Sequence, residues 1–180
     1  MLERIPKYLV PSDHKRMPHR LTDVLVIGGG LAGLRAALAV PDDQSVLVVT
    51  KGGLRQSNSN YAQGGIAGVL DPEDRFEDHI ADTIAAGCGL CDQEVVEMVV
   101  REAPDRINEL IEWGTNFDQV AGVLDLGREG GHSHHRIVHA LGDATGKELM
   151  RAVINRACGM PNVETLEHSF TLDLLTHNGS

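Results

Sequence analysis

The chain has 180 residues, of which 42% are hydrophobic and 23% charged, with a formal net charge of −10 at pH 7. The length fits about one domain, and this apolar content excludes an intrinsically disordered chain. The absence of any run of about 18 apolar residues argues against a membrane partner, and the negative charge argues against nucleic acid. Three cysteines cannot form a paired framework, which predicts a reducing, cytoplasmic location.

Residues 1–22 differ from the remainder, because they carry five basic and two acidic residues together with three prolines. No helical or strand period runs through them. We expect residues 1–22 to form a basic, proline-containing leader and residues 23–180 to form a domain. The composition of residues 1–22 would also fit a basic tail that binds a partner.

The domain opens with the order of a βαβ unit. Val24–Ile27 and Val46–Val49 are short apolar runs, which predict parallel strands buried on both faces. Residues 28–33 form a G-x-G-x-x-G turn, and residues 34–40 favour a helix that ends at Pro41. This order predicts an α/β, Rossmann-like domain with a parallel sheet.

Helices inserted after this unit are expected from apolar spacing and caps. Asp74 is the expected cap of a helix with Phe76, Ile80 and Ile84 on one face, and Asp92 caps a second. Pro104 is expected to start a third helix that ends at Gly114. A helix over 145–157 and strands over 163–166 and 170–175 complete the prediction.

The last residues predict that the sheet is incomplete. Asn178-Gly179 is a strong signal for a two-residue hairpin turn, but one residue follows it. A strand without its partner leaves an unpaired edge. We therefore expect the N-terminal part of a longer domain, with a frayed natural terminus as the alternative.

The glycine turn has a specific use in dinucleotide binding. Gly28 forms the tight turn, Gly30 lets a diphosphate approach the backbone, and Gly33 permits close helix packing, while the helix N-terminus attracts the phosphates. The second strand ends in Thr50-Lys51 where NAD-binding folds usually place an acid. NAD is thereby disfavoured, whereas NADP or a flavin fits.

Several motifs in register with this turn resemble the flavoprotein family of succinate dehydrogenase, fumarate reductase and L-aspartate oxidase, and most closely its L-aspartate oxidase branch. They are Thr50-Lys51-Gly52, residues 58–67, Arg128-Glu129-Gly130-Gly131-His132 and Asp143-Ala144-Thr145-Gly146. The resemblance implies that FAD is held by the following residues: Gly28, Gly29, Gly30, Leu31, Ala32, Gly33, Lys51, Asn58, Ser59, Asn60, Tyr61, Ala62, Gln63, Gly64 and Gly65.

Two positions distinguish members of this family. Succinate dehydrogenases carry a histidine bonded to the flavin where this chain has Asn58, so the resemblance implies non-covalent FAD. Glu129 stands where the related dicarboxylate enzymes have an aromatic residue, and the resemblance assigns it to the substrate amine. Without that resemblance, Glu129 would be interpreted as an ordinary surface acid.

Two other clusters could indicate a metal or a redox pair. The histidines at 132, 134, 135 and 139 lie close together but lack zinc-type spacing, so we expect no metal and interpret them as lining the site. Cys88 and Cys91 form a C-x-x-C pattern without a second pair, which we interpret as accidental.

The resemblance implies oxidation of L-aspartate to iminoaspartate in NAD biosynthesis, with oxygen or fumarate as acceptor and a functional link to quinolinate synthase. It also implies that the arginines acting on the dicarboxylate lie in segments outside these 180 residues, so that the fragment alone is not a competent oxidase. The alternatives are a succinate dehydrogenase or fumarate reductase flavoprotein, a non-catalytic FAD-binding fragment and an NADP dehydrogenase.

Overall fold

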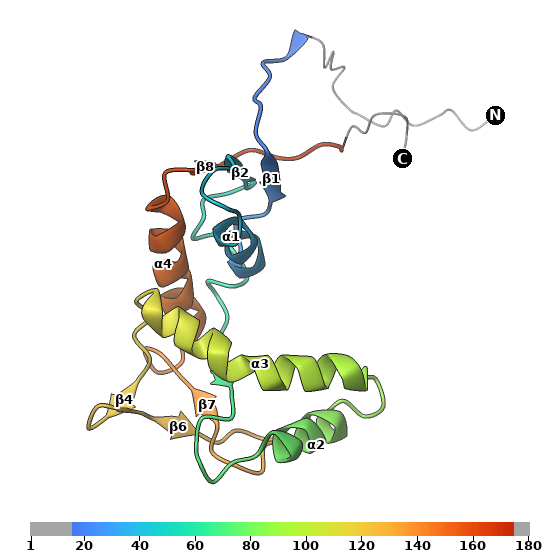
Figure 1. Cartoon of the computed structure of the whole chain (residues 1–180), viewed down its shortest axis with the longest axis vertical. Coiled ribbons are helices and arrows are strands. Elements are labelled where there is room, and N and C mark those ends of the chain that lie inside the picture. The colour runs from blue at the N-terminus through green and yellow to red at the C-terminus, as the bar shows by residue number, and fades with distance from the viewer. Residues whose placement is uncertain (1–15, 175–180) are drawn as a thin grey trace, which may run out of the picture.

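The computed structural model describes residues 16–174. Its first sheet is parallel, with strand order β1 (Val24–Ile27), β2 (Val46–Val49), β8 (Val163–Leu166). Helices α1 (Leu31–Leu38) and α4 (Thr145–Cys158) lie beside this sheet at one end of the molecule (Figure 1). The predicted α/β class and parallel sheet are therefore confirmed.

An apolar core joins the sheet to the two helices. Alternate residues of β2, Val46 and Val48, are fully buried against Leu34 of α1. The α4 residues that belong to this core lie on one helix face, at spacings of three, four and seven from the first: Met150, Val153, Ile154 and Ala157. Burial of a side chain of this size contributes about 1.5–3 kcal/mol.

The prediction that β1 is buried on both faces is wrong. Leu25 is 52% exposed and Ile27 47% exposed, whereas the first three residues of β2 are buried. The strand order places β1 at an edge of the sheet, and in the described residues only one of its faces meets the core. Apolar content alone could not distinguish the edge strand from the central one.

Helices α2 (Phe76–Ala86) and α3 (Gln93–Glu112) pack on each other, away from the sheet (Figure 1). Asp92 caps α3 as predicted, since its carboxylate accepts the Val95 N–H at 3.3 Å. The expected helix start at Pro104 is wrong, because α3 runs through this residue. Val100 and Ile107, seven residues apart, are both buried, so one continuous face is packed despite the hydrogen bond that proline cannot donate.

The rest of the far end is built from short antiparallel strands that the sequence did not predict. Strands β3 (Ile66–Ala67), β7 (Ile137–Val138) and β6 (Leu126–Gly127) form one sheet in that order. Strands β4 (Gln119–Val120) and β5 (Val123–Leu124) form a hairpin. A second core lies here, made of Ile107, Phe117, Val138, Ala140 and Leu149.

The predictions for the chain ends divide into three groups. The helix from residue 145 and the strand over 163–166 are confirmed as α4 and β8. The strand expected over 170–175 is wrong for residues 170–174, which form no strand. Phe170, Leu172 and Leu174 are each at least 65% exposed, so no described strand or helix covers this apolar row. Residues 1–15 of the leader and Asn178-Gly179 lie outside the described residues.

A buried ion cluster fixes α2 to the short strands. Arg136 is 0% exposed, and its Nε and Nη2 each donate to one oxygen of Asp74 at 2.8 Å. Its Nη1 donates to Asp82 of α2 at 2.7 Å. Asp74 was predicted to cap α2, which is wrong: the cap position is Arg75, and Asp74 turns its carboxylate to Arg136. A buried guanidinium needs such partners because desolvation penalises an unpaired charge.

We expect Asp74→Asn to destabilise the fold by about 3–5 kcal/mol, because Arg136 would keep its charge in a buried site and lose its bidentate partner. The matched control is Asp78→Asn, whose ion pair with exposed Arg75 is screened by solvent and should contribute little to the free energy of unfolding. Urea unfolding of the purified protein measures both changes. Equal losses in the two variants would contradict the assignment.

The second carboxylate gives a pH-dependent prediction. Burial alone would raise the pKa of Asp82, but hydrogen bonds from Ser133 and Arg136 lower this pKa to about 2. Its stabilising effect is thus complete above the unfolded-state pKa and is lost as the pH falls through the folded-state pKa. Asp82→Asn should therefore unfold more readily than the wild type at pH 7, with the difference narrowing from about pH 5 toward about pH 2. Urea midpoints at several pH values test this; a constant difference would refute it.

Candidate functional site

The glycine turn brings the backbone of α1 very close to the end of β1. Gly28 has φ +115°, which few other residues adopt, and its N–H donates to the Val49 carbonyl at 2.8 Å. A Cβ at Gly33 would lie 2.0 Å from the Gly28 carbonyl oxygen. The turn therefore has no room for a side chain at residue 33, as the sequence motif predicts.

The first turn of α1 meets the polar loop that follows β2. The Leu31 N–H donates to the Ser59 hydroxyl at 3.2 Å, and a Cβ at Gly30 would lie 3.4 Å from the same oxygen. The cap residue of α1 is Gly30, which has no side chain to occupy the helix N-terminus. Backbone N–H groups and the positive end of the helix dipole are thus available to an anion here.

A cavity of about 480 Å³ opens at this point. It lies where β1 and β2 end, the position at which open parallel sheets bind ligands. Its lining combines the glycine turn with residues after each of the three strands: Ile27, Gly28, Gly29, Gly30, Val49, Thr50, Lys51, Gln56, Ser57, Asn58, Ser59, Ser169, Phe170 and Thr171. The sequence prediction included Lys51 and Asn58 and missed Gln56, Ser57 and residues 169–171.

A second cavity of about 180 Å³ continues along the loop toward α4. Its lining comes from α1, the loop and the start of α4: Leu31, Ser59, Ala62, Gln63, Gly64, Gly65, Ile66, Thr145, Gly146, Leu149 and Met150. Four predicted cofactor residues line neither cavity: Ala32, Gly33, Asn60 and Tyr61. Ala32 and Tyr61 are exposed, and Asn60 borders a separate hollow together with Arg55.

The start of α4 holds the loop in place. The Gly146 N–H donates to the Ala62 carbonyl at 3.1 Å, and a Cβ at Gly146 would lie 2.1 Å from the Ser59 carbonyl oxygen. Asp143 accepts the Gly64 N–H at 2.8 Å. Neither Asp143 nor Gly146 is among the site residues predicted from the sequence. A glycine at the start of a helix was the available signal, because it indicates close backbone approach.

Glu129 lies beside the same loop although 64 residues separate it from Gly65. It occupies the turn between β6 and β7, and its Oε1 is 3.8 Å from the position of a Cβ on Gly64. The same oxygen is 2.9 Å from Nε2 of His139, and the Glu129 side chain is 50% exposed. The structure therefore brings this predicted residue next to Gly64, which lines the second cavity, although Glu129 itself is not among the residues that line it.

The four clustered histidines point to different partners. His139 contacts Glu129, while Nδ1 of His135 is 3.1 Å from the Leu126 carbonyl oxygen. His132 packs against buried His79, with ring centroids 5.6 Å apart, and burial lowers the pKa of His79. Of these three histidines, only His139 lies next to the loop over residues 58–65.

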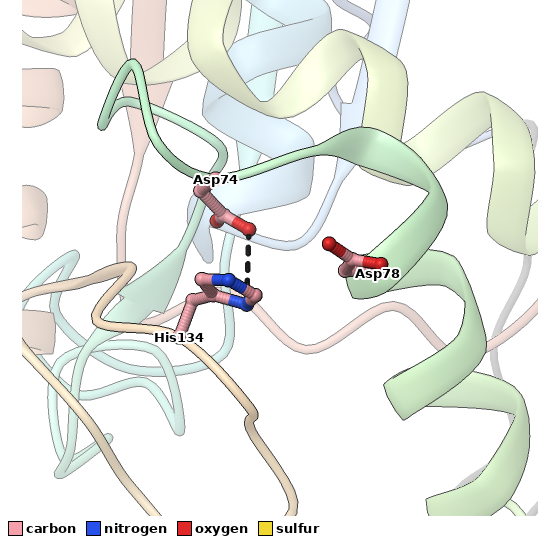
Figure 2. A group of neighbouring side chains, drawn as sticks. All are labelled: Asp74, Asp78 and His134. Atoms are coloured by element: carbon pink, nitrogen blue, oxygen red, sulfur yellow. Dashed lines mark ion pairs between the residues drawn. The ribbon is translucent and has the colours of Figure 1, made fainter.

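The remaining histidine, His134, belongs to a group with Asp74 and Asp78 that has metal-ligand composition (Figure 2). Its Nδ1 is 3.5 Å from Asp74. Both carboxylates already bind guanidinium groups, Asp74 that of Arg136 and Asp78 that of Arg75 at 3.0 and 3.1 Å. The hydrogen bond from Arg75 also lowers the pKa of Asp78. A cation would have to displace two arginines, so these contacts favour an ion-pair cluster.

Comparison with known proteins identifies the domain. Residues 23–180 match the family described as FAD binding domain. The chain belongs to this family. FAD is therefore the cofactor of the domain, and the glycine turn, the space above it and the helix N-terminus suit the diphosphate of such a cofactor.

Named relatives and solved structures agree with this family. The chain is 51% identical over 158 residues to L-aspartate oxidase 2-b, chloroplastic, of Nicotiana tabacum, covering 87% of this chain and 24% of that protein. It is 47% identical to L-aspartate oxidase of Streptomyces coelicolor, covering 86% and 27%. A mutant E. coli quinol fumarate reductase superposes on the FAD-binding domain with TM-score 0.83 and 31% identity, covering 88% and 28%.

The chain spans about a quarter of the length of the curated relatives it matches.

All three cysteines, at 88, 91 and 158, are free thiols. Within residues 16–174, no helix combines the length and apolar character needed to cross a bilayer.

We expect Gly33→Ala to abolish stable FAD binding, because its methyl group would meet the Gly28 carbonyl at 2.0 Å and move α1 away from the turn. Gly130→Ala is the matched control, since a Cβ there meets nothing within 4 Å. Flavin absorbance of the purified variants, corrected for protein, measures retention. Full flavin content in Gly33→Ala would contradict this account of the turn.

Proposed function

We propose that this chain supplies the FAD-binding part of a flavoprotein that oxidises L-aspartate to iminoaspartate. The observation that carries the substrate class is the Glu129 carboxylate beside Gly64, a residue of the predicted flavin loop that lines the second cavity. The relatives named L-aspartate oxidase at 51% and 47% identity support the same activity. Residues 23–180 then form the N-terminal part of the FAD-binding domain, preceded by the leader over 1–22.

In this proposal the cofactor's diphosphate lies on the glycine turn, over Gly28, Gly29, Gly30, Leu31, Ala32 and Gly33. Lys51, exposed on the wall of the same cavity, contributes a positive charge next to that diphosphate. Asn58, Ser59, Asn60, Tyr61, Ala62, Gln63, Gly64 and Gly65 hold the remainder through backbone and amide groups. Asn58 cannot form a covalent flavin bond, so the FAD is non-covalent.

Glu129 distinguishes aspartate from succinate in this scheme. The two substrates differ by one α-ammonium group, and a carboxylate about 4 Å from it contributes up to about 4 kcal/mol at an effective dielectric constant of about 20. Desolvation of both groups removes part of this energy. A net preference of about 1–3 kcal/mol corresponds to roughly tenfold to hundredfold discrimination.

The flavin, when bound, supplies the two-electron acceptor for hydride from the substrate Cα. The residues of this chain have the narrower tasks of holding the cofactor and orienting the amine. Oxygen or fumarate would reoxidise the cofactor, and iminoaspartate would be passed toward quinolinate and NAD synthesis, which gives the link to quinolinate synthase. We place the protein in the cytoplasm; its named plant relatives are chloroplastic.

A dicarboxylate oxidoreductase of the fumarate reductase type is the second candidate. The 31% identity and TM-score of 0.83 to quinol fumarate reductase favour it, because the same fold holds the cofactor in both classes. The carboxylate of Glu129 separates the candidates, since its negative charge can pair with a substrate amine and finds no such partner on a substrate that lacks one.

We expect Glu129→Phe to lower the preference for aspartate over succinate by about tenfold to hundredfold, because it removes the partner of the ammonium and the penalty on succinate. Flavin reduction by each substrate, measured on the FAD-loaded protein as the cell makes it, gives the ratio of kcat/KM. Asp125→Asn, an exposed acid near the same turn, is the control. An unchanged ratio would refute the role of Glu129, and a wild-type protein that oxidises succinate better than aspartate would establish the second candidate.

A further inference from the structure

The His139 side chain occupies a narrow slot between two glycine backbones. A Cβ at Gly65 would lie 3.0 Å from its Cδ2, and a Cβ at Gly127 would lie 3.0 Å from its Cε1. The side chain is 25% exposed, and the His139 carbonyl accepts the Asp118 N–H at 2.8 Å. Both the ring and the backbone are therefore fixed by the strands around them.

Glu129 has a different environment. Its side chain is 50% exposed, and the contact with His139 is the side-chain hydrogen bond that the described residues give it. Two glycines follow it, and Gly131 has φ +85°, so the turn is built from residues with few steric restraints. An exposed glutamate on such a turn samples several rotamers unless a partner holds it.

The hydrogen bond joins a rigid donor to a mobile acceptor. Nε2 of His139 is 2.9 Å from Oε1 of Glu129. Because an ionised carboxylate only accepts hydrogen bonds, the proton of this bond belongs to Nε2. One carboxylate oxygen is thus held against the imidazole, and the other stays available to a cationic group from the cavity.

We propose that His139 is a positioning residue for substrate recognition: it holds the Glu129 carboxylate beside Gly64 so that this carboxylate meets the amine of an amino dicarboxylate. The inference rests on the proposed function. His139 acts through Glu129 and does not itself contact the substrate. An exposed ion pair between two flexible side chains would contribute little free energy, because both side chains lose rotamer freedom when it forms. Here the His139 ring is already immobilised in its slot, so only Glu129 loses that freedom.

The test compares substitutions of His139 in the FAD-loaded protein as the cell makes it. His139→Phe keeps a ring of similar shape and removes the donor, and we expect KM for aspartate to rise about tenfold with kcat changed less than about twofold. His139→Asn, whose amide is too short to reach Glu129, should do the same. His139→Gln, which can place an amide N–H near the position of Nε2, should restore KM to within about threefold.

A double-mutant cycle with Glu129→Gln separates positioning from a structural effect. If His139 acts through Glu129, adding His139→Phe to Glu129→Gln changes KM for aspartate by less than about twofold. A structural role would instead give the full tenfold increase in both backgrounds, and would raise KM for succinate equally. His135→Phe, at an exposed histidine on the approach to β7 whose Nδ1 lies near the Leu126 carbonyl, is the matched control and should leave KM unchanged.

The outcomes distinguish the two proposals. A wild-type protein that does not oxidise aspartate overturns the proposed function and the role of His139 with it. An active wild type whose Glu129→Gln variant has an unaltered KM for aspartate overturns the roles of Glu129 and His139 but leaves the activity standing. An active wild type that is impaired by Glu129→Gln but unaffected by His139→Phe and His139→Asn overturns only the role of His139. Additive effects in the cycle, or failure of His139→Gln to restore KM, also overturn it.

Discussion

Close approach of backbone to backbone is the constraint on which the site depends. In α1, a Cβ at Gly33 would lie 2.0 Å from the Gly28 carbonyl oxygen. In α4, a Cβ at Gly146 would lie similarly close to the Ser59 carbonyl oxygen. These two contacts set the separation of the glycine turn, the polar loop and α4. Since a protein interior transmits small displacements, a methyl group at either glycine would alter the cavities rather than be absorbed locally.

Glu129 and His139 belong to the far end of the molecule and lie next to Gly64 and Gly65 of the polar loop. The short strands of that end form few backbone hydrogen bonds with one another, and the second core is small. The buried Arg136 cluster therefore contributes much of what holds this end of the molecule together. Arg136 directly precedes β7, and His139 directly follows it. The guanidinium thereby fixes one end of the strand whose other end carries the imidazole.

Sequence patterns correctly predicted those elements whose structure depends on residues close together in the chain. The strand, glycine turn and helix after residue 23 follow from apolar runs and glycine chemistry, and the Asp92 cap follows from its position. The sequence could not show that Asp74 faces Arg136 rather than α2, because their partnership spans 62 residues. For the same reason, the cavity walls at Gln56 and residues 169–171 emerged only from the fold. The roles assigned to Lys51 and to residues 58–65 remain predictions.

In the proposed function, the residues that hold the cofactor and the residues that recognise the substrate amine come from different parts of the chain. The cofactor site is formed by the parallel sheet, α1 and the loop after β2, whereas Glu129 lies in the turn between β6 and β7 and His139 directly follows β7 in the small antiparallel sheet. Substitutions in the turn between β6 and β7 can therefore change the charge that faces the substrate without moving the glycine turn. Under that proposal, one FAD-binding fold can accept dicarboxylates with or without an amine, because the cofactor requires backbone geometry, while the substrate requires a side chain held at a defined place.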